Sequence, residues 1–116
     1  MGLDEFRALG AEVLVSTEDG SHAHAGLVTD LLLKTLSEPT ESAVYACGPN
    51  AMLRVVSEIC RAHGVPCQIS LDAPMPCGVG ACWGCAVPVA LPDGGVWYRR
   101  VCVEGPVFRA EEVLWE

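Results

Sequence analysis

The residues best suited to chemistry in this chain are four cysteines in its C-terminal half. Cys77, Cys82 and Cys85 follow the spacing C-x4-C-x2-C, and Cys102 comes later. This is the plant-type pattern of thiolates that hold a [2Fe–2S] cluster, in which each tetrahedral iron needs two protein sulfurs. The pattern predicts a loop that supplies three ligands and a distant strand that supplies the fourth.

Glycines between these cysteines support the same interpretation. Gly78, Gly80 and Gly84 interrupt the cysteine-rich stretch. Glycine adopts positive φ angles and lets backbone N–H groups approach an anionic cluster without steric cost. Such N–H groups also tune the reduction potential of a cluster. Trp83, which lies between two of the cysteines, is expected to shield the cluster from water.

A structural zinc site is the main alternative for these thiols. Zinc sites usually contain two compact C-x2-C pairs, whereas here only Cys82 and Cys85 form one. In that case the protein is a zinc-stabilised interaction domain without redox activity. Disulfides are less favoured, because the chain has seven cysteines, an odd number, and no secretory segment at its start. A metal-free cysteine cluster is the weakest alternative.

Size and charge limit the other possible functions. The chain has 116 residues, of which 51% are hydrophobic, enough for one compact domain with a small appendage. Fifteen acidic residues against seven basic ones give a net charge of −8. This balance disfavours binding to nucleic acid or to an anionic membrane, since phosphate contacts need clustered Lys and Arg. Without a long apolar run, we expect a soluble, cytoplasmic protein.

Helical and strand patterns alternate over residues 1–71. Apolar residues at helical spacing, and short runs of β-branched and apolar residues, mark these elements. The expected helices are Leu3–Leu9, Leu27–Leu36 and a helix from Asn50 to Gly64, and the expected strands are Glu12–Thr17, Ala43–Ala46 and Cys67–Leu71. Strands separated by helices imply parallel pairing. The sequence therefore predicts an α/β fold with part of a doubly wound parallel sheet.

The pattern changes after residue 71. Ala86–Leu91 and Val96–Val103 flank the turn sequence Pro-Asp-Gly-Gly and predict a β-hairpin whose second strand carries Cys102. Folding back in this way brings Cys102 toward the other three cysteines. We place a domain boundary near residue 72, between an α/β unit (1–71) and a small β iron–sulfur module (72–116). Arg99 and Arg100 are expected at a solvated strand edge.

A second motif, Cys47-Gly48-Pro49, lies between an expected strand and an expected helix. In open α/β sheets this edge binds ligands, and a helix N-terminus attracts anions. The motif alone is also typical of a tight turn with a buried cysteine. Its position upstream of the cysteine loop favours a functional role.

These motifs together resemble the C-terminal part of the electron-transfer subunit of dihydroorotate dehydrogenase, a member of the ferredoxin–NAD(P) reductase superfamily. The resemblance extends from about Leu3 to Leu114. It is carried by Cys47-Gly48-Pro49 with Met52, by Ser70-Leu71-Asp72, by the cysteine loop of residues 77–85, and by residues 100–108.

The resemblance implies an electron path from NADH through FAD and a [2Fe–2S] cluster to an FMN-containing catalytic subunit. That subunit oxidises dihydroorotate to orotate in pyrimidine biosynthesis. By position, the implied cluster ligands are Cys77, Cys82, Cys85 and Cys102. The implied neighbours of the nicotinamide are Cys47, Gly48 and Pro49, and the implied neighbours of the dinucleotide are Thr17, Asp19 and Gly20.

The chain also departs from the family pattern. Family members begin with a flavin-binding β-barrel and a Gly-rich phosphate turn, and neither occurs before Cys47. We therefore expect a fragment, a split gene product or a mis-started reading frame, with the FAD domain supplied by a separate chain. Alone, it is expected to bind no FAD and to show no NADH oxidation. An alternative keeps the cluster but assigns it to a sulfide dehydrogenase, a hydrogenase or a ferredoxin:NADP oxidoreductase.

Overall fold

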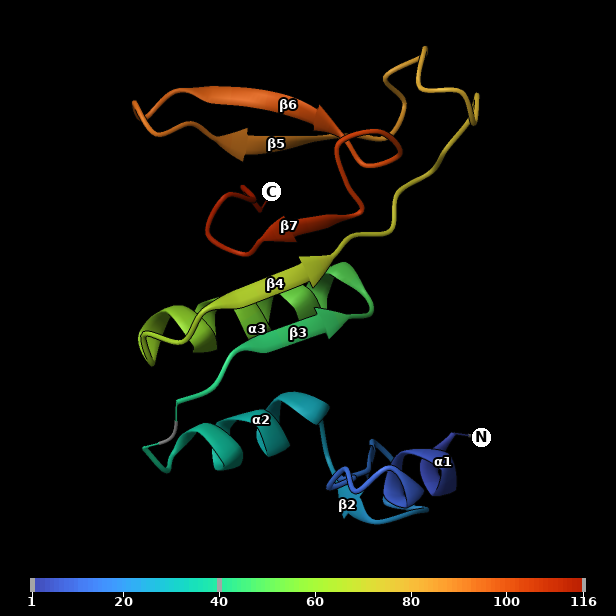
Figure 1. Cartoon of the computed structure of the whole chain (residues 1–116), viewed down its shortest axis with the longest axis vertical. Coiled ribbons are helices and arrows are strands. Elements are labelled where there is room, and N and C mark those ends of the chain that lie inside the picture. Colours follow the sequence, from blue (N-terminus) through green and yellow to red (C-terminus); the bar gives the residue numbers. More distant parts are fainter. Residues whose placement is uncertain (1, 40, 116) are drawn as a thin grey trace. The chain divides into compact units, whose positions relative to one another are not determined.

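The computed structural model of the chain describes residues 2–39 and 41–115. It consists of two compact units, unit 1 (Met1–Pro39) and unit 2 (Thr40–Glu116). Each unit is described by itself, and both can be followed in Figure 1. No helix in the described ranges is long and apolar enough to cross a membrane.

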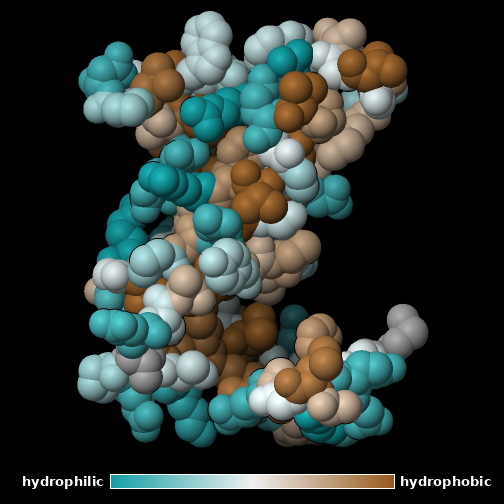
Figure 2. Space-filling model, in the orientation of Figure 1, coloured by the Kyte–Doolittle hydropathy of each residue, from teal (hydrophilic) through white to brown (hydrophobic). Residues whose placement is uncertain are grey.

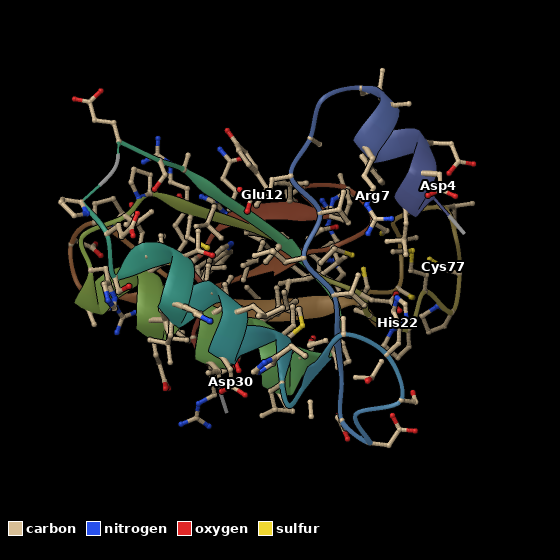
Figure 3. All side chains as sticks on the ribbon, turned by 90° about the horizontal axis from the view of Figure 1, so that it is seen from below. Asp4, Arg7, Glu12, His22, Asp30 and Cys77 are labelled. Carbon is tan, nitrogen blue, oxygen red and sulfur yellow. The ribbon has the colours of Figure 1, made fainter. Side chains whose placement is uncertain are left out.

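Unit 1 contains two helices and a minimal parallel pair of strands. Its elements are α1 (Leu3–Ala8), β1 (Ser16–Thr17), β2 (His24–Ala25) and α2 (Val28–Leu36). Both helices confirm the sequence prediction. On α1, the Asp4 carboxylate and the Arg7 guanidinium lie 3.5 Å apart, one turn from each other (Figure 3). At the start of α2, the Asp30 carboxylate accepts a hydrogen bond of 3.0 Å from the N–H of Leu27.

The strand predicted over residues 12–17 is much shorter than expected. Only Ser16 and Thr17 form ladder pairs, because their partner β2 is itself two residues long. One further bond joins the N–H of His24 to the carbonyl of Val15 at 3.1 Å. The apolar run before Ser16 therefore lacks a ladder within the described residues of this unit.

Unit 2 is built on a three-stranded sheet with the order β3-β4-β7. The sheet and its crossover helix consist of β3 (Val44–Cys47), α3 (Asn50–Ala62), β4 (Cys67–Ser70) and β7 (Val107–Arg109). β3 and β4 run parallel, as predicted, and α3 connects them. β7 pairs antiparallel with β4 and was not predicted from the sequence. The α/β class is confirmed, and the doubly wound arrangement stays a prediction.

The predicted hairpin is present, but its second strand is shorter than expected. β5 (Ala86–Ala90) pairs antiparallel with β6 (Val96–Arg100). Cys102 therefore does not lie in the strand, which corrects the prediction, but in the turn of residues 101–104. The Glu104 carboxylate accepts a 2.6 Å bond from the N–H of Arg100, and the Glu104 N–H donates a 2.8 Å bond to the carbonyl of Arg100. These two bonds close the turn and end the ladder.

Apolar side chains from both parts of unit 2 form its core. α3 contributes Leu53 and Cys60, and β4 contributes Ile69, all less than 2% exposed. The hairpin and the following turn contribute Val89 and Val101, each 0% exposed. Full burial of such an aliphatic side chain stabilises the fold by about 1.5–3 kcal/mol. Cys60 is thus a core residue.

β7 connects the α/β part of unit 2 to the hairpin part. It follows the turn that holds Cys102 and returns to pair with β4, with Ile69 opposite Phe108. The C-terminal segment after β7 then forms a bridge from Val113 to Val89 of β5. The domain boundary expected near residue 72 stays a prediction, and backbone hydrogen bonds join the chain on its two sides.

Candidate cluster-binding site

The cysteine loop leaves the end of β4 and returns to the chain at β5 (Figure 1), and Cys77 lies on it (Figure 3). Gly78 and Gly80 have φ angles of 64° and 77°, the left-handed conformation that the sequence analysis expected of this loop. Trp83 also has a positive φ, of 60°. A non-glycine residue in this region is strained, so the surrounding contacts must hold it there.

Cys77 is surrounded by backbone N–H groups. The backbone amides of Val79, Cys82 and Ala81 lie close enough to its sulfur to favour the thiolate, and Val79 has the largest effect. They lower the pKa of the Cys77 thiol from 9.0 to about 6, and the thiol of Cys82 adds a further, smaller lowering. The folded loop thus stabilises a thiolate at this position near neutral pH, which is the protonation state that binds metal.

Cys85 and Cys102 form a second pair of thiols. Their sulfurs lie 3.3 Å apart, and the N–H of Cys102 lies 3.5 Å from the sulfur of Cys85. The N–H of Cys102 lowers the pKa of Cys85, whereas the hydrogen bond to Cys85 raises the pKa of Cys102. The surroundings therefore favour the thiolate at Cys85 more than at Cys102.

Cys85 and Cys102 form one contacting pair, with 3.3 Å between their sulfurs, and the thiol of Cys82 lies near enough to Cys77 to lower its pKa. The N–H of Gly84 donates to the sulfur of Cys82 at 3.3 Å. Among the described residues, no three Cys, His, Asp or Glu side chains are close enough together to hold one ion. Two pairs of sulfurs with N–H groups directed at them fit a two-iron cluster, in which each iron takes two thiolates.

Arg100 contacts the cysteine loop and was not identified from the sequence as a site residue. Its Nη1 donates to the carbonyl of Gly80 at 2.7 Å, and its Nη2 and Nε bond the two carboxylate oxygens of Glu104 at 2.8 and 3.3 Å. Its guanidinium lies 4.6 Å from the ring centroid of Trp83. The Arg100 side chain is only 22% exposed, so the solvated edge expected for it is wrong.

Two glycines of the loop sit where a side chain would collide. A Cβ at Gly80 would lie 2.7 Å from a methyl group of Val103, and one at Gly84 would lie 2.8 Å from the ring of Pro76. The loop at Gly80 lies directly against Val103 in the turn that carries Cys102. At Gly84, near the end of the loop, it lies directly against Pro76, near its start. Both glycines are therefore required by close approach.

Apolar side chains lie at the surface around the cysteine loop. Met75, Val79 and Trp83 on the loop and Val103 on the adjacent turn are 47–80% exposed. Hydrophobic surface is visible over this loop at the upper right of Figure 2. Trp83 is thus nearly half exposed while it stacks on Arg100. Its expected role as a shield against water stays a prediction.

The Cys47-Gly48-Pro49 motif lies where the sequence placed it, between β3 and α3. Cys47 ends β3 and is exposed, and Pro49 immediately precedes α3. A Cβ at Gly48 would lie 2.6 Å from the terminal methyl of Met52. The Gly48 backbone therefore packs directly against the first turn of the helix.

Thr17 ends β1 of unit 1, and Asp19 and Gly20 lie between β1 and β2. The Thr17 hydroxyl donates to the carbonyl of His22 at 2.9 Å, and the Asp19 carboxylate accepts from the N–H of Ser21 at 3.0 Å. This N–H lowers the pKa of Asp19. These three residues belong to unit 1, whereas the Cys47-Gly48-Pro49 motif belongs to unit 2.

Both a family model and a solved structure are similar to this chain. Residues 72–114 match the family model described as the iron–sulfur cluster binding domain of dihydroorotate dehydrogenase B. A solved structure of an NADH-dependent reduced ferredoxin–NADP oxidoreductase, from work on flavin-based electron bifurcation, is also similar. It gives a TM-score of 0.76 at 36% identity, and the match covers 97% of this chain and 39% of that chain.

Curated relatives are named as electron transfer subunits of dihydroorotate dehydrogenase B (NAD(+)). The one from Caldanaerobacter subterraneus subsp. tengcongensis is 49% identical over 97% of this chain and 44% of its own length. The one from Bacillus caldolyticus is 46% identical over 96% of this chain and 40% of its own length. A probable subunit of the same name from Methanopyrus kandleri is 42% identical over 95% and 39%. The chain thus spans less than half of each of these relatives.

Proposed function

We propose that the chain transfers electrons in the oxidation of dihydroorotate to orotate, because residues 72–114 match the iron–sulfur cluster binding domain of dihydroorotate dehydrogenase B. The similarity of almost the whole chain to named electron transfer subunits supports the proposal. The cofactor is a [2Fe–2S] cluster, with Cys77, Cys82, Cys85 and Cys102 as its ligands. When bound, such a cluster accepts and releases one electron at a time.

The arrangement of the four thiols is the observation that carries the proposal. Cys77 with Cys82, and Cys85 with Cys102, would provide two ligands for each of two irons. The N–H groups of Val79, Ala81 and Cys82 favour the Cys77 thiolate, and the N–H of Cys102 does the same for Cys85. The chain thus favours the thiolate that iron requires at Cys77 and Cys85, one sulfur of each proposed pair.

The remaining cofactors and partners belong to the same proposal. NADH and FAD belong to the same proposed electron path as the cluster. The catalytic partner is an FMN-containing dihydroorotate dehydrogenase subunit, and the site of action is the cytoplasm. Thr17, Asp19 and Gly20 would lie near the dinucleotide, and Cys47, Gly48 and Pro49 near the nicotinamide.

The proposed domain organisation follows from the strand connections. The parallel pair β3–β4 with its crossover α3 is one βαβ unit, which is the repeating element of doubly wound sheets. We infer that residues 1–71 are part of such a nucleotide-binding domain, followed by the iron–sulfur module of residues 72–116. Similarity to the ferredoxin–NADP oxidoreductase structure over 97% of this chain supports the inference.

Reduction of the chain by dihydroorotate would test the function. The chain, reconstituted anaerobically with iron and sulfide, is mixed with a dihydroorotate dehydrogenase catalytic subunit, and dihydroorotate is added. We expect the visible absorbance to bleach only when all three are present. NADH added to the isolated chain should cause no turnover of an artificial acceptor. A cluster that stays oxidised in the complete mixture would contradict the assignment of the substrate.

A second candidate is an electron-transfer role in a ferredoxin–NADP oxidoreductase. The similarity to that solved structure, with a TM-score of 0.76, favours it specifically. The same reconstituted chain distinguishes the two functions. Reduction by reduced ferredoxin, together with no response to dihydroorotate and its catalytic subunit, would support the second candidate.

A further inference from the structure

We propose that Arg100 is a positioning residue that fixes the cysteine loop for cluster binding and, together with Glu104, sets the reduction potential of the site. The inference rests on the proposed function, because it concerns the same cluster. Arg100 connects three parts of the site: the loop through Gly80, the turn of Cys102 through Glu104, and the ring of Trp83.

The contact with Gly80 acts on Cys77 through one peptide unit. In a trans peptide the carbonyl of one residue and the N–H of the next point in opposite directions. Arg100 Nη1 donates to the Gly80 carbonyl at 2.7 Å, and the N–H of Ala81, in the same peptide, is one of the backbone groups that lower the pKa of Cys77. A charge-assisted bond at the carbonyl thus fixes the orientation of an N–H donor to a proposed ligand.

The contact with Trp83 supports the other side of the loop. Trp83 has a φ of 60° and lies between Cys82 and Gly84, in the short segment that joins Cys82 to Cys85. The guanidinium lies over the indole in a cation–π contact, with 4.6 Å between its carbon and the ring centroid. The guanidinium of Arg100 therefore contacts both segments of the loop, the one from Cys77 to Cys82 through Gly80 and the one from Cys82 to Cys85 through Trp83.

The charges of Arg100 and Glu104 act on the potential in opposite directions. Arg100 lies two residues before Cys102 and bonds the Gly80 carbonyl of the cysteine loop at 2.7 Å, which places its cation within electrostatic range of the proposed ligands. Reduction adds one negative charge to a cluster bound there, so a nearby cation favours the reduced state and a nearby carboxylate disfavours it. Removing either partner leaves the other charge uncompensated.

Four variants test the inference in the reconstituted chain. Redox titration measures the midpoint potential, and hydrogen exchange of the iron-free chain measures protection of the loop amides, including that of Ala81. We expect Arg100→Met to lower the potential, Glu104→Gln to raise it, and Arg100→Lys to leave it nearly unchanged because the charge stays. Arg54→Met is the matched control, since Arg54 and Glu58 form an exposed pair of the same spacing on α3.

Hydrogen exchange tests the positioning role without iron. Arg100→Met and Arg100→Lys should each speed exchange of the Ala81 amide by about tenfold, the loss expected for one charge-assisted hydrogen bond. Lys lacks the planar fork that bonds Gly80 and Glu104 together. Arg54→Met should change neither the exchange rate nor the potential.

Two results would overturn the inference. One is a shift of the potential in the same direction for Arg100→Met and Glu104→Gln, which is expected if the two residues only maintain the fold. The other is exchange of the Ala81 amide in Arg100→Met that matches the wild type. A wild-type chain that takes up no iron would instead refute the proposed function, while the exchange comparison still decides the contact with Gly80.

Discussion

Substitution of Gly80 by alanine tests how tightly the cysteine loop packs against the turn of Cys102. Gly80 has a φ of 77°, and a Cβ there would lie 2.7 Å from a methyl group of Val103. The left-handed conformation costs an alanine about 1–2 kcal/mol. The steric contact adds about 1 kcal/mol, the low end of overpacking costs, because Val103 is 52% exposed and can partly move. We expect a total loss of about 2–3 kcal/mol.

Gly78 provides the matched control, since its φ is 64° and nothing lies within 4 Å of a Cβ built there. Gly78→Ala should therefore lose only the conformational part, about 1–2 kcal/mol. Adding Val103→Ala to Gly80→Ala should restore the steric part. Urea unfolding of the iron-free chain gives the free energy of unfolding of each variant. Equal losses for Gly78→Ala and Gly80→Ala, or no rescue by Val103→Ala, would refute the reasoning.

Three further predictions follow from the cysteines and the core. Cys82→Ser should abolish the visible chromophore of the reconstituted chain, whereas Cys60→Ser should retain it; an unchanged spectrum of the first would refute the ligand assignment. In the iron-free chain, the rate of Cys77 modification by iodoacetamide should fall as the pH drops through about 6, because its pKa is lowered to that value and only the thiolate reacts. Cys67, whose pKa burial raises to about 12, should stay unmodified at pH 7, and mass spectrometry that finds it modified first would contradict this order. Phe108→Ala should cost about 3–5 kcal/mol, because Phe108 is only 4% exposed in the core, and a loss below about 1 kcal/mol in urea unfolding would contradict its place there.

The sequence was sufficient to predict the helices and the hairpin. The helix that begins at Asn50 has an apolar face at helical spacing, and Gly64 ends it with a φ of 64°. The Pro-Asp-Gly-Gly turn marks the hairpin in the same way. These signals are local, since they depend on residues within a few positions of each other.

Elements that depend on distant partners were not predictable. β7 has only three residues, Val107–Arg109, and is a strand because it pairs with β4, far away in the sequence. The predicted strand of residues 12–17 shows the opposite case. Its composition is typical of a strand, but only Ser16 and Thr17 have ladder partners in unit 1. Strand propensity therefore gave both a missed strand and an overextended one.

The candidate site was predictable in its residue types but not in its contacts. Cysteine spacing identified four thiols, yet the pairing of Cys85 with Cys102 at 3.3 Å depends on the turn that Glu104 closes. The sequence predicts a solvent-exposed side chain at Arg100, because two adjacent arginines in an edge strand are usually exposed. The glutamate four residues after it was the available signal, since that spacing allows a bidentate ion pair in a turn.

Metal and sulfide content of the reconstituted wild-type chain tests the central claim most directly. Chemical analysis under anaerobic conditions, together with the visible spectrum, measures both. We predict about two irons and two acid-labile sulfides per chain, with absorption in the visible region. A colourless protein that holds about one zinc per chain would contradict the claim, and would mean that the four thiols only stabilise the fold.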